Sequence, residues 1–247
     1  MFTHRFLGLC NLIFYIYSNK EFDKSKDVFV TNYVPEKHNV YVTLSKLGIN
    51  ILFDNSLAQI ERTPNINNSH NYYDFRQNFE YFDINKFREQ LCIDNVNTVV
   101  PIKELVYESV PDIQERVCIN IRRGDYFSVL HYGKFNVLSK KWITEVYNKY
   151  YQGNKVIVVS DDIEWCKSHL SDLCDDIIFY HNENEYIIDL YMLAESKAII
   201  GSGSSFSVIG AYLNKNNDCV FPYPFFRDPA YFWGETVVPN WTKRENI

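Results

Sequence analysis

The chain has 247 residues, enough to bury a sizeable core as one large domain or two smaller lobes. Its formal net charge is −6 and its pI is about 5.5, which argues against broad binding to nucleic acids or anionic membranes and restricts any basic site to a local cluster. The six cysteines form no C-x-x-C pair and have no histidine at ligand spacing, so we expect a reducing compartment and no structural zinc.

The first part of the chain carries weak structural signals. The apolar segment 6–17 is too short to span a bilayer and is followed by no small-residue cleavage site, so we interpret it as a core helix. Pro111 and Asp112 interrupt the chain before a strongly apolar run, and we place the boundary between two lobes there, at 1–112 and 113–247. Within the first lobe, short strands and helices are expected at 28–32, 40–44, 85–92 and 102–108.

From residue 117 onward the pattern becomes regular. Apolar runs typical of buried strands alternate with amphipathic segments that begin at serine or aspartate, the residues preferred at helix N-caps. Such alternation predicts an α/β fold with a parallel sheet covered by helices on both faces. We expect strands at 117–121, 155–160, 176–180, 198–200 and 219–221, and helices at 139–150, 163–170, 185–196 and from Ser204 and Ser205 to 213.

The run 117–127, VCINIRRGDYF, is the most informative stretch of the chain. It predicts a buried strand that delivers Arg122, Arg123 and Asp125 to its carboxyl end, where open α/β sheets bind ligands. Two adjacent guanidinium groups suit phosphate oxygens, and Gly124 permits a close turn around them. Two simpler explanations remain open at this point: solvated surface charge, and an Arg-Gly-Asp tripeptide displayed on a loop for an adhesion receptor.

Two further predicted strand ends carry polar groups. Asp161 and Asp162 follow the second strand, and the Gly- and Ser-rich run 201–205 follows the fourth. Since neighbouring parallel strands end at the same edge, these groups can converge with the arginines. Each has a structural explanation as well, because acidic residues and serines stabilise helix N-termini. The run 201–205 lacks the Lys of a P-loop and the spacing of a dinucleotide fingerprint.

These segments resemble the α-1,2-fucosyltransferases of glycosyltransferase family 11. Residues 120–126 match the family motif His-x-Arg-Arg-Gly-Asp-Tyr at every fixed position except the first, and residues 160–166 match Ser-Asp-Asp-x-x-Trp-Cys. Residues 203–213 are similar to the family's closing Asn-Ser-Ser-Phe-Ser block, and residues 8–14 to its opening Gly-Leu-Gly-Asn-Gln segment. The resemblance is strong in the second half of the chain and faint between residues 18 and 111.

The resemblance implies a GT-B-like fold of two Rossmann-like lobes with parallel sheets, in which the second lobe binds GDP-fucose and the first faces the acceptor. It implies inverting, metal-independent transfer of L-fucose from GDP-β-L-fucose to a glycan hydroxyl, without a cofactor. Arg122 and Arg123 would stabilise the departing β-phosphate. Asp125 is the candidate general base, although it could equally cap the turn or pair with Arg123. The donor-binding residues would be Asn120, Arg122, Arg123, Asp161, Asp162, Ser204, Ser205, Phe206, Gly8 and Asn11.

The chain also departs from the family pattern. Asn120 stands where the family has a His, Cys10 and Leu12 stand for a Gly and a Gln, Gly203 stands for an Asn, and Val208 and Ile209 replace two Trp. These changes leave open a family member that binds a sugar nucleotide or glycan but is retuned or inactive. The expected partners are GDP-fucose and a glycan acceptor, with no nucleic acid and no integral membrane segment. Without such a segment, a cytoplasmic protein is expected.

Overall fold

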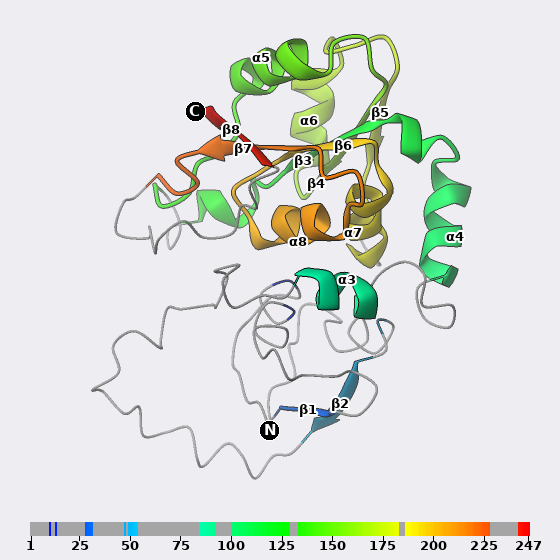
Figure 1. Ribbon diagram of the computed structural model, residues 1–247. Helices are drawn as coiled ribbons and strands as arrows, with labels where there is room; N and C mark the ends of the chain where they lie inside the picture. The colour runs from blue at the N-terminus through cyan, green and yellow to red at the C-terminus, as the bar shows by residue number, and fades with distance from the viewer. Residues whose placement is uncertain are drawn as a thin grey trace. The chain divides into compact units, whose positions relative to one another are not determined.

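A computed structural model describes residues 10, 13, 28–31, 47, 49–53, 84–91, 100–128, 133–182, 186–227 and 242–247 (Figure 1). The chain divides into two compact units, Met1–Pro101 and Ile102–Ile247. The division falls before the expected boundary at residue 112, so most of helix α4 (Val100–Ser109) belongs to the second unit. In the described part of the chain, no helix is long and apolar enough to cross a membrane.

In the first unit, the described elements are two strands and a helix. Strands β1 (Val28–Thr31) and β2 (Asn50–Phe53) pair in parallel, with Val28 opposite Asn50. Helix α3 is Ile84–Leu91, within one residue of the expected helix at both ends. Cys10 and Ile13 are helical and buried, as the core helix expected at 6–17 requires at these two positions. The strand expected at 40–44 lies outside the described residues.

In the second unit, the described strands form one six-stranded parallel sheet in the order β5-β4-β3-β6-β7-β8. This order is that of a doubly wound Rossmann sheet, so the α/β class with a parallel sheet is confirmed. The direction of winding reverses between the neighbours β3 and β6, and ligands of such sheets bind at this switch point. The strands are β3 (Val117–Ile121), β4 (Val156–Ser160), β5 (Ile177–Tyr180), β6 (Ala198–Gly201), β7 (Cys219–Tyr223) and β8 (Thr242–Asn246).

Helices cover both faces of the sheet. Figure 1 shows α5 (Lys140–Tyr150) and α6 (Ile163–Leu170) on one face, and α7 (Tyr186–Glu195) and α8 (Ser205–Leu213) on the other. Three of these helices start at the N-caps that the sequence predicts: the side chains of Ser139, Asp162 and Ser204 each accept a backbone N–H of the first turn. Two short 3-10 turns, η3 (Ile113–Glu115) and η4 (Asp125–Phe127), flank β3.

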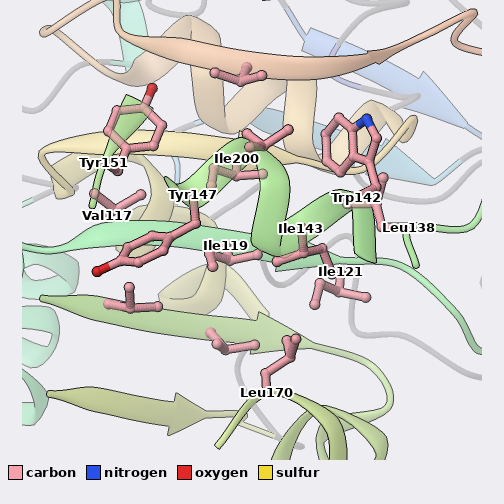
Figure 2. Packing of buried hydrophobic residues seen from close by; sticks show 14 of the residues in the cluster. Val117, Ile119, Ile121, Leu138, Trp142, Ile143, Tyr147, Tyr151, Leu170 and Ile200 are labelled. Atoms are coloured by element: carbon pink, nitrogen blue, oxygen red, sulfur yellow. The ribbon is translucent and has the colours of Figure 1, made fainter. Parts of the chain in front are cut away.

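The core on the α5 and α6 face explains the alternation in β3. Figure 2 shows Val117, Ile119 and Ile121 directed toward Ile143 and Tyr147 of α5, and all five side chains are buried. The intervening β3 residues are buried as well, so both faces of the strand are covered. Complete burial of a central strand fixes the position of its carboxyl end, and the arginines begin directly after it.

In the second unit, β8 is the strand that the sequence does not predict. Its residues, Thr-Lys-Arg-Glu-Asn, show no apolar alternation, yet they pair with β7 in parallel from Thr242 to Asn246. The strand lies at the edge of the sheet and is half-buried or exposed, and polar side chains are tolerated there. The indole Nε1 of Trp142 donates to the carbonyl of Asn246 at 2.9 Å, which ties β8 to α5.

Candidate active site

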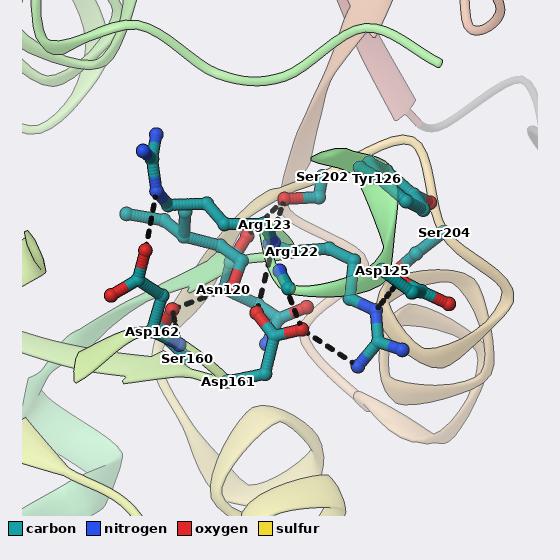
Figure 3. A network of polar contacts seen from close by, with 12 residues as sticks. Asn120, Arg122, Arg123, Asp125, Tyr126, Ser160, Asp161, Asp162, Ser202 and Ser204 are labelled. Carbon is teal, nitrogen blue, oxygen red and sulfur yellow. Dashed lines mark hydrogen bonds and ion pairs between the residues drawn. The ribbon is translucent and has the colours of Figure 1, made fainter. Parts of the chain in front are cut away.

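The carboxyl ends of three adjacent strands bring the predicted site residues together. Arg122 follows β3, Asp161 follows β4 and Ser202 follows β6, and β3 lies between the other two strands. Figure 3 shows the polar network that these strand ends form. The polar groups therefore converge at one edge of the sheet, as the alternating pattern predicts, and the strand order places this edge at the switch point.

Asp161 holds the loop that follows β3. Its Oδ1 accepts the backbone N–H of Arg123 at 2.8 Å, and its Oδ2 accepts that of Gly124 at 3.0 Å. The same Oδ2 lies 2.9 Å from Nη1 of Arg122. A Cβ at Gly124 would lie 2.7 Å from this Oδ2, so the close approach requires glycine. Both carboxylate oxygens of Asp161 are thus engaged by the loop, before any ligand is present.

Arg122 extends along the loop toward two carboxylates. Its Nε donates to Oδ1 of Asp125 at 3.0 Å, in addition to the contact of its Nη1 with Asp161. Burial lowers the pKa of the guanidinium, but the ion pairs with Asp161 and Asp125 outweigh that effect and raise the pKa above its ordinary value. The side chain is 39% exposed, so this permanent positive charge remains open to a ligand.

Arg123 extends to the opposite side of the loop (Figure 3). Its Nε donates to Oδ2 of Asp162 at 3.0 Å, while Oδ1 of the same carboxylate caps α6. The guanidinium carbon lies 3.7 Å from the centre of the Trp165 indole and 4.9 Å from that of the Phe127 ring. The side chain is 14% exposed, so Arg123 is more deeply buried than Arg122.

The divergence of the two arginines spreads the positive charge over the strand end. Together with Asp125, Asp161 and Asp162, they form a cluster with one more carboxylate than guanidinium groups. An anionic ligand must therefore compete with internal ion pairs or use the guanidinium nitrogens that these pairs leave open. The expectation that both arginines flank a single phosphate stays a prediction.

Asn120 points into the protein. Its Nδ2 donates to the carbonyl of Val159 at 3.1 Å, and its Oδ1 accepts the hydroxyl of Ser207 at 2.6 Å. The residue is 5% exposed. The amide thereby joins β3 to β4 and α8, and a contact between this side chain and a guanine base would have to replace one of these bonds.

The other predicted binding residues lie at two places. Ser204 is the N-cap of α8, and its Oγ accepts the backbone N–H of Ser207 at 3.2 Å. Ser205 does not share the cap, because it is already the first helical residue, and like Phe206 it is half-buried. Gly8 and Asn11 lie outside the described residues, so their predicted roles at the donor stay predictions.

Three residues that the prediction did not assign to the site support it. The hydroxyl of Ser202 accepts the backbone N–H of Arg122 at 2.8 Å and donates to the carbonyl of Asn120 at 2.8 Å. The hydroxyl of Ser160 donates to the carbonyl of Ile121 and accepts the N–H of Asp162. Both serines come directly at strand ends, and that position is the signal that could have identified them. The third residue, Trp165, belongs to the motif at residues 160–166. It lies on α6, whereas its partner Arg123 lies on the loop after β3, so the motif alone does not reveal the contact.

Tyr126 connects the loop after β3 to the loop before α8. Its hydroxyl donates to the carbonyl of Gly203 at 2.7 Å, and its ring stacks on Phe135 with centroids 4.3 Å apart. Burial raises the pKa of this phenol, so it stays neutral and keeps its donor proton. A Cβ at Gly203 would lie 2.7 Å from the carbonyl oxygen of Phe225, so the larger Asn of the family pattern would not fit here without a shift of the backbone.

Comparison with known proteins places this geometry in a family. Residues 53–243 match the family model described as glycosyl transferase family 11. An alpha-1,2-colitosyltransferase of Escherichia coli is 33% identical in an alignment of 181 residues that covers 69% of this chain and 61% of that protein. The O-antigen biosynthesis glycosyltransferase WbnK of Escherichia coli is 30% identical in an alignment of 148 residues that covers 58% of this chain and 46% of that protein.

Among solved structures, the fucosyltransferase NodZ from Bradyrhizobium is distantly similar to this chain. Its TM-score is 0.45 at 14% sequence identity, over 86% of this chain and 92% of that one, which is too distant to bear on function. The chain spans less than two thirds of the length of both curated relatives. The family match, in contrast, covers most of the chain and includes the strand ends described above. This chain belongs to glycosyltransferase family 11.

Proposed function

We propose that this protein is an inverting glycosyltransferase that moves L-fucose from GDP-β-L-fucose to a hydroxyl of a glycan acceptor. The observation that carries the proposal is the position of Arg122 and Arg123 at the switch point of the sheet, in a chain that belongs to this family. An open sheet binds nucleotides there, and guanidinium groups match the oxygens of a diphosphate.

The proposed chemistry needs positive charge beside the leaving group. In a direct displacement the bond from the sugar to the β-phosphate breaks as the acceptor oxygen attacks, so negative charge builds up on the departing GDP. A preorganised cation stabilises that charge more in the transition state than in the ground state, which lowers the barrier. Arg122 is 39% exposed and already held by Asp161 and Asp125, so it suits this role.

Asp125 is our candidate for the general base. Its side chain is 49% exposed, and its Oδ1 accepts a hydrogen bond from Nε of Arg122 at 3.0 Å. For this role the acceptor hydroxyl must lie within reach of Asp125 on the face of the sugar opposite the departing diphosphate, where the carboxylate takes its proton during attack, a contribution of typically about 10²- to 10⁴-fold. The contact with Arg122 supports the alternative that Asp125 mainly orients the arginine.

A second sugar donor is a candidate beside GDP-fucose. One relative is named as an alpha-1,2-colitosyltransferase, so a nucleotide-linked colitose is a second candidate for the sugar that is transferred. The described strand ends contact the nucleotide in our proposal and not the sugar. Either donor is therefore compatible with the roles assigned to the two arginines.

The experiment is a transfer assay on the purified protein, without metal and with EDTA, using GDP-fucose and a panel of glycan acceptors that differ in their terminal sugar. We expect release of GDP together with an α-linked fucosylated product, and loss of both in Arg122→Ala. Transfer that occurs only after a divalent metal is added would contradict the metal-independent mechanism that the family resemblance implies. Binding of GDP with no product from either donor would favour the alternative of a nucleotide-binding family member without turnover.

A further inference from the structure

Four side chains from α6 and the loop after β3 form a continuous stack. The imidazole of His169 packs on the indole of Trp165, with centroids 4.4 Å apart and planes 17° from parallel. The guanidinium of Arg123 lies over Trp165, and Phe127 follows at 4.9 Å from the guanidinium carbon. Two aromatic rings thus contact the same cation, and the cation–π attraction of indole is the strongest of the side chains.

The contacts of Arg123 leave one edge of its guanidinium open. Nε donates to Asp162, and no interaction of the two terminal nitrogens with a described residue is present beyond the aromatic contacts. Figure 3 shows these nitrogens pointing away from Asp162, with no interaction to the other residues drawn. Arg122, by comparison, already uses Nε and one terminal nitrogen on carboxylates. Arg123 therefore offers both terminal nitrogens of its planar fork to a phosphate.

A fork fixed before binding is a better receptor than a mobile one. A free arginine side chain loses much conformational freedom when it binds an anion, and prior fixing removes that cost from the binding step. Asp162 fixes the Nε end of the guanidinium, but one hydrogen bond leaves rotation about that bond possible. Of the two aromatic contacts, the indole face of Trp165 is the nearer, at 3.7 Å against 4.9 Å for Phe127, and it is the contact that restrains the guanidinium plane most closely.

We propose that Trp165 is a positioning residue for the donor diphosphate, acting through Arg123. The indole holds the guanidinium plane with its open edge available to the anion. This proposal rests on the proposed function, because it takes GDP as the ligand. It assigns Trp165 no contact with the nucleotide itself.

The test is calorimetric titration with GDP of the wild-type protein and of Trp165→Leu, Trp165→Phe and Arg123→Ala. Trp165→Leu should weaken GDP binding by about 5- to 30-fold, the equivalent of about 1 to 2 kcal/mol at 1.4 kcal/mol per tenfold. Trp165→Phe keeps an aromatic face and should stay within about threefold of wild type. Lys167→Ala, an exposed change on the same helix, should leave the affinity unchanged.

A double-mutant cycle separates positioning from a general effect on the fold. If Trp165 acts through Arg123, Trp165→Leu should add nothing to the loss already caused by Arg123→Ala. Independent, multiplying losses would overturn the proposal, as would wild-type affinity in Trp165→Leu. Should Trp165→Leu fail to fold, Arg123→Lys keeps the charge but removes the planar fork, and wild-type affinity in that variant overturns the proposal equally. Absence of GDP binding in the wild-type protein would instead remove the proposed function, and this inference with it.

Discussion

Replacing Asp161 by Asn tests whether this carboxylate holds the loop after β3. The carboxylate accepts the N–H groups of Arg123 and Gly124 on different oxygens and contacts Nη1 of Arg122. Asn has a single acceptor oxygen, so its amide NH₂ must face at least one of these donors. Losing one hydrogen bond that involves a charged group costs about 1.5–3 kcal/mol. Because the side chain is 23% exposed, we expect about 2 kcal/mol.

A loss of this size should lower the midpoint of thermal unfolding by about 4–8 °C in a unit of this length. The same variant should bind GDP more weakly, because the loop that carries Arg122 and Arg123 loses a backbone anchor, and we expect this loss to outweigh the removal of a carboxylate that competes with the ligand for Arg122. The matched control is Asp172→Asn, which removes a surface ion pair with Lys140 in which the aspartate is 68% exposed. The control should leave both the midpoint and the affinity unchanged. Equal behaviour of the two variants would refute the role of Asp161.

Three further predictions concern the fold around the site. Gly210→Ala places a Cβ 2.6 Å from Cδ2 of Leu193, so overpacking between α8 and α7 should reduce the free energy of unfolding in urea by about 1–3 kcal/mol, and an unchanged value would contradict this packing. Ser207→Ala leaves Oδ1 of the buried Asn120 without its hydroxyl donor and should cost about 1–3 kcal/mol in the same assay, whereas a neutral effect would mean that the bond is not formed. Burial raises the pKa of Asp189 to about 7, so the folded protein retains this proton where the unfolded chain has lost it. The free energy of unfolding should therefore fall as pH rises from about 4 to about 7, and Asp189→Asn should remove that fall; a parallel pH profile in the variant would show that Asp189 is not its source.

Much of the second unit could be predicted from the sequence because its local signals agree. Apolar runs set the central strands, and the N-caps Ser139, Asp162 and Ser204 set the starts of three helices. Strand β8 could not be predicted, because its polar residues carry no periodicity and it forms only through pairing with β7. Pairing of this kind depends on a distant segment, and a local pattern does not encode it.

The candidate site was only partly predictable for the same reason. The alternating pattern placed Arg122, Arg123 and Asp161 at one edge of a sheet, and the structure confirms this location. It could not show that the two arginines diverge, since the direction of each guanidinium is set by carboxylates and rings on other elements. Nor could it show that the amide of Asn120 is engaged inside the protein, because its partners come from β4 and α8.

The most direct test of the central claim, a nucleotide diphosphate site at the ends of β3 and β4, is calorimetric titration of GDP into the metal-free protein and into Arg122→Ala. Lys140→Ala, which removes an exposed lysine at the start of α5, is the control for a general loss of positive charge. We predict micromolar binding of GDP that is lost in Arg122→Ala and retained in Lys140→Ala. The absence of wild-type binding at millimolar GDP, or equal affinity in all three proteins, would contradict this account.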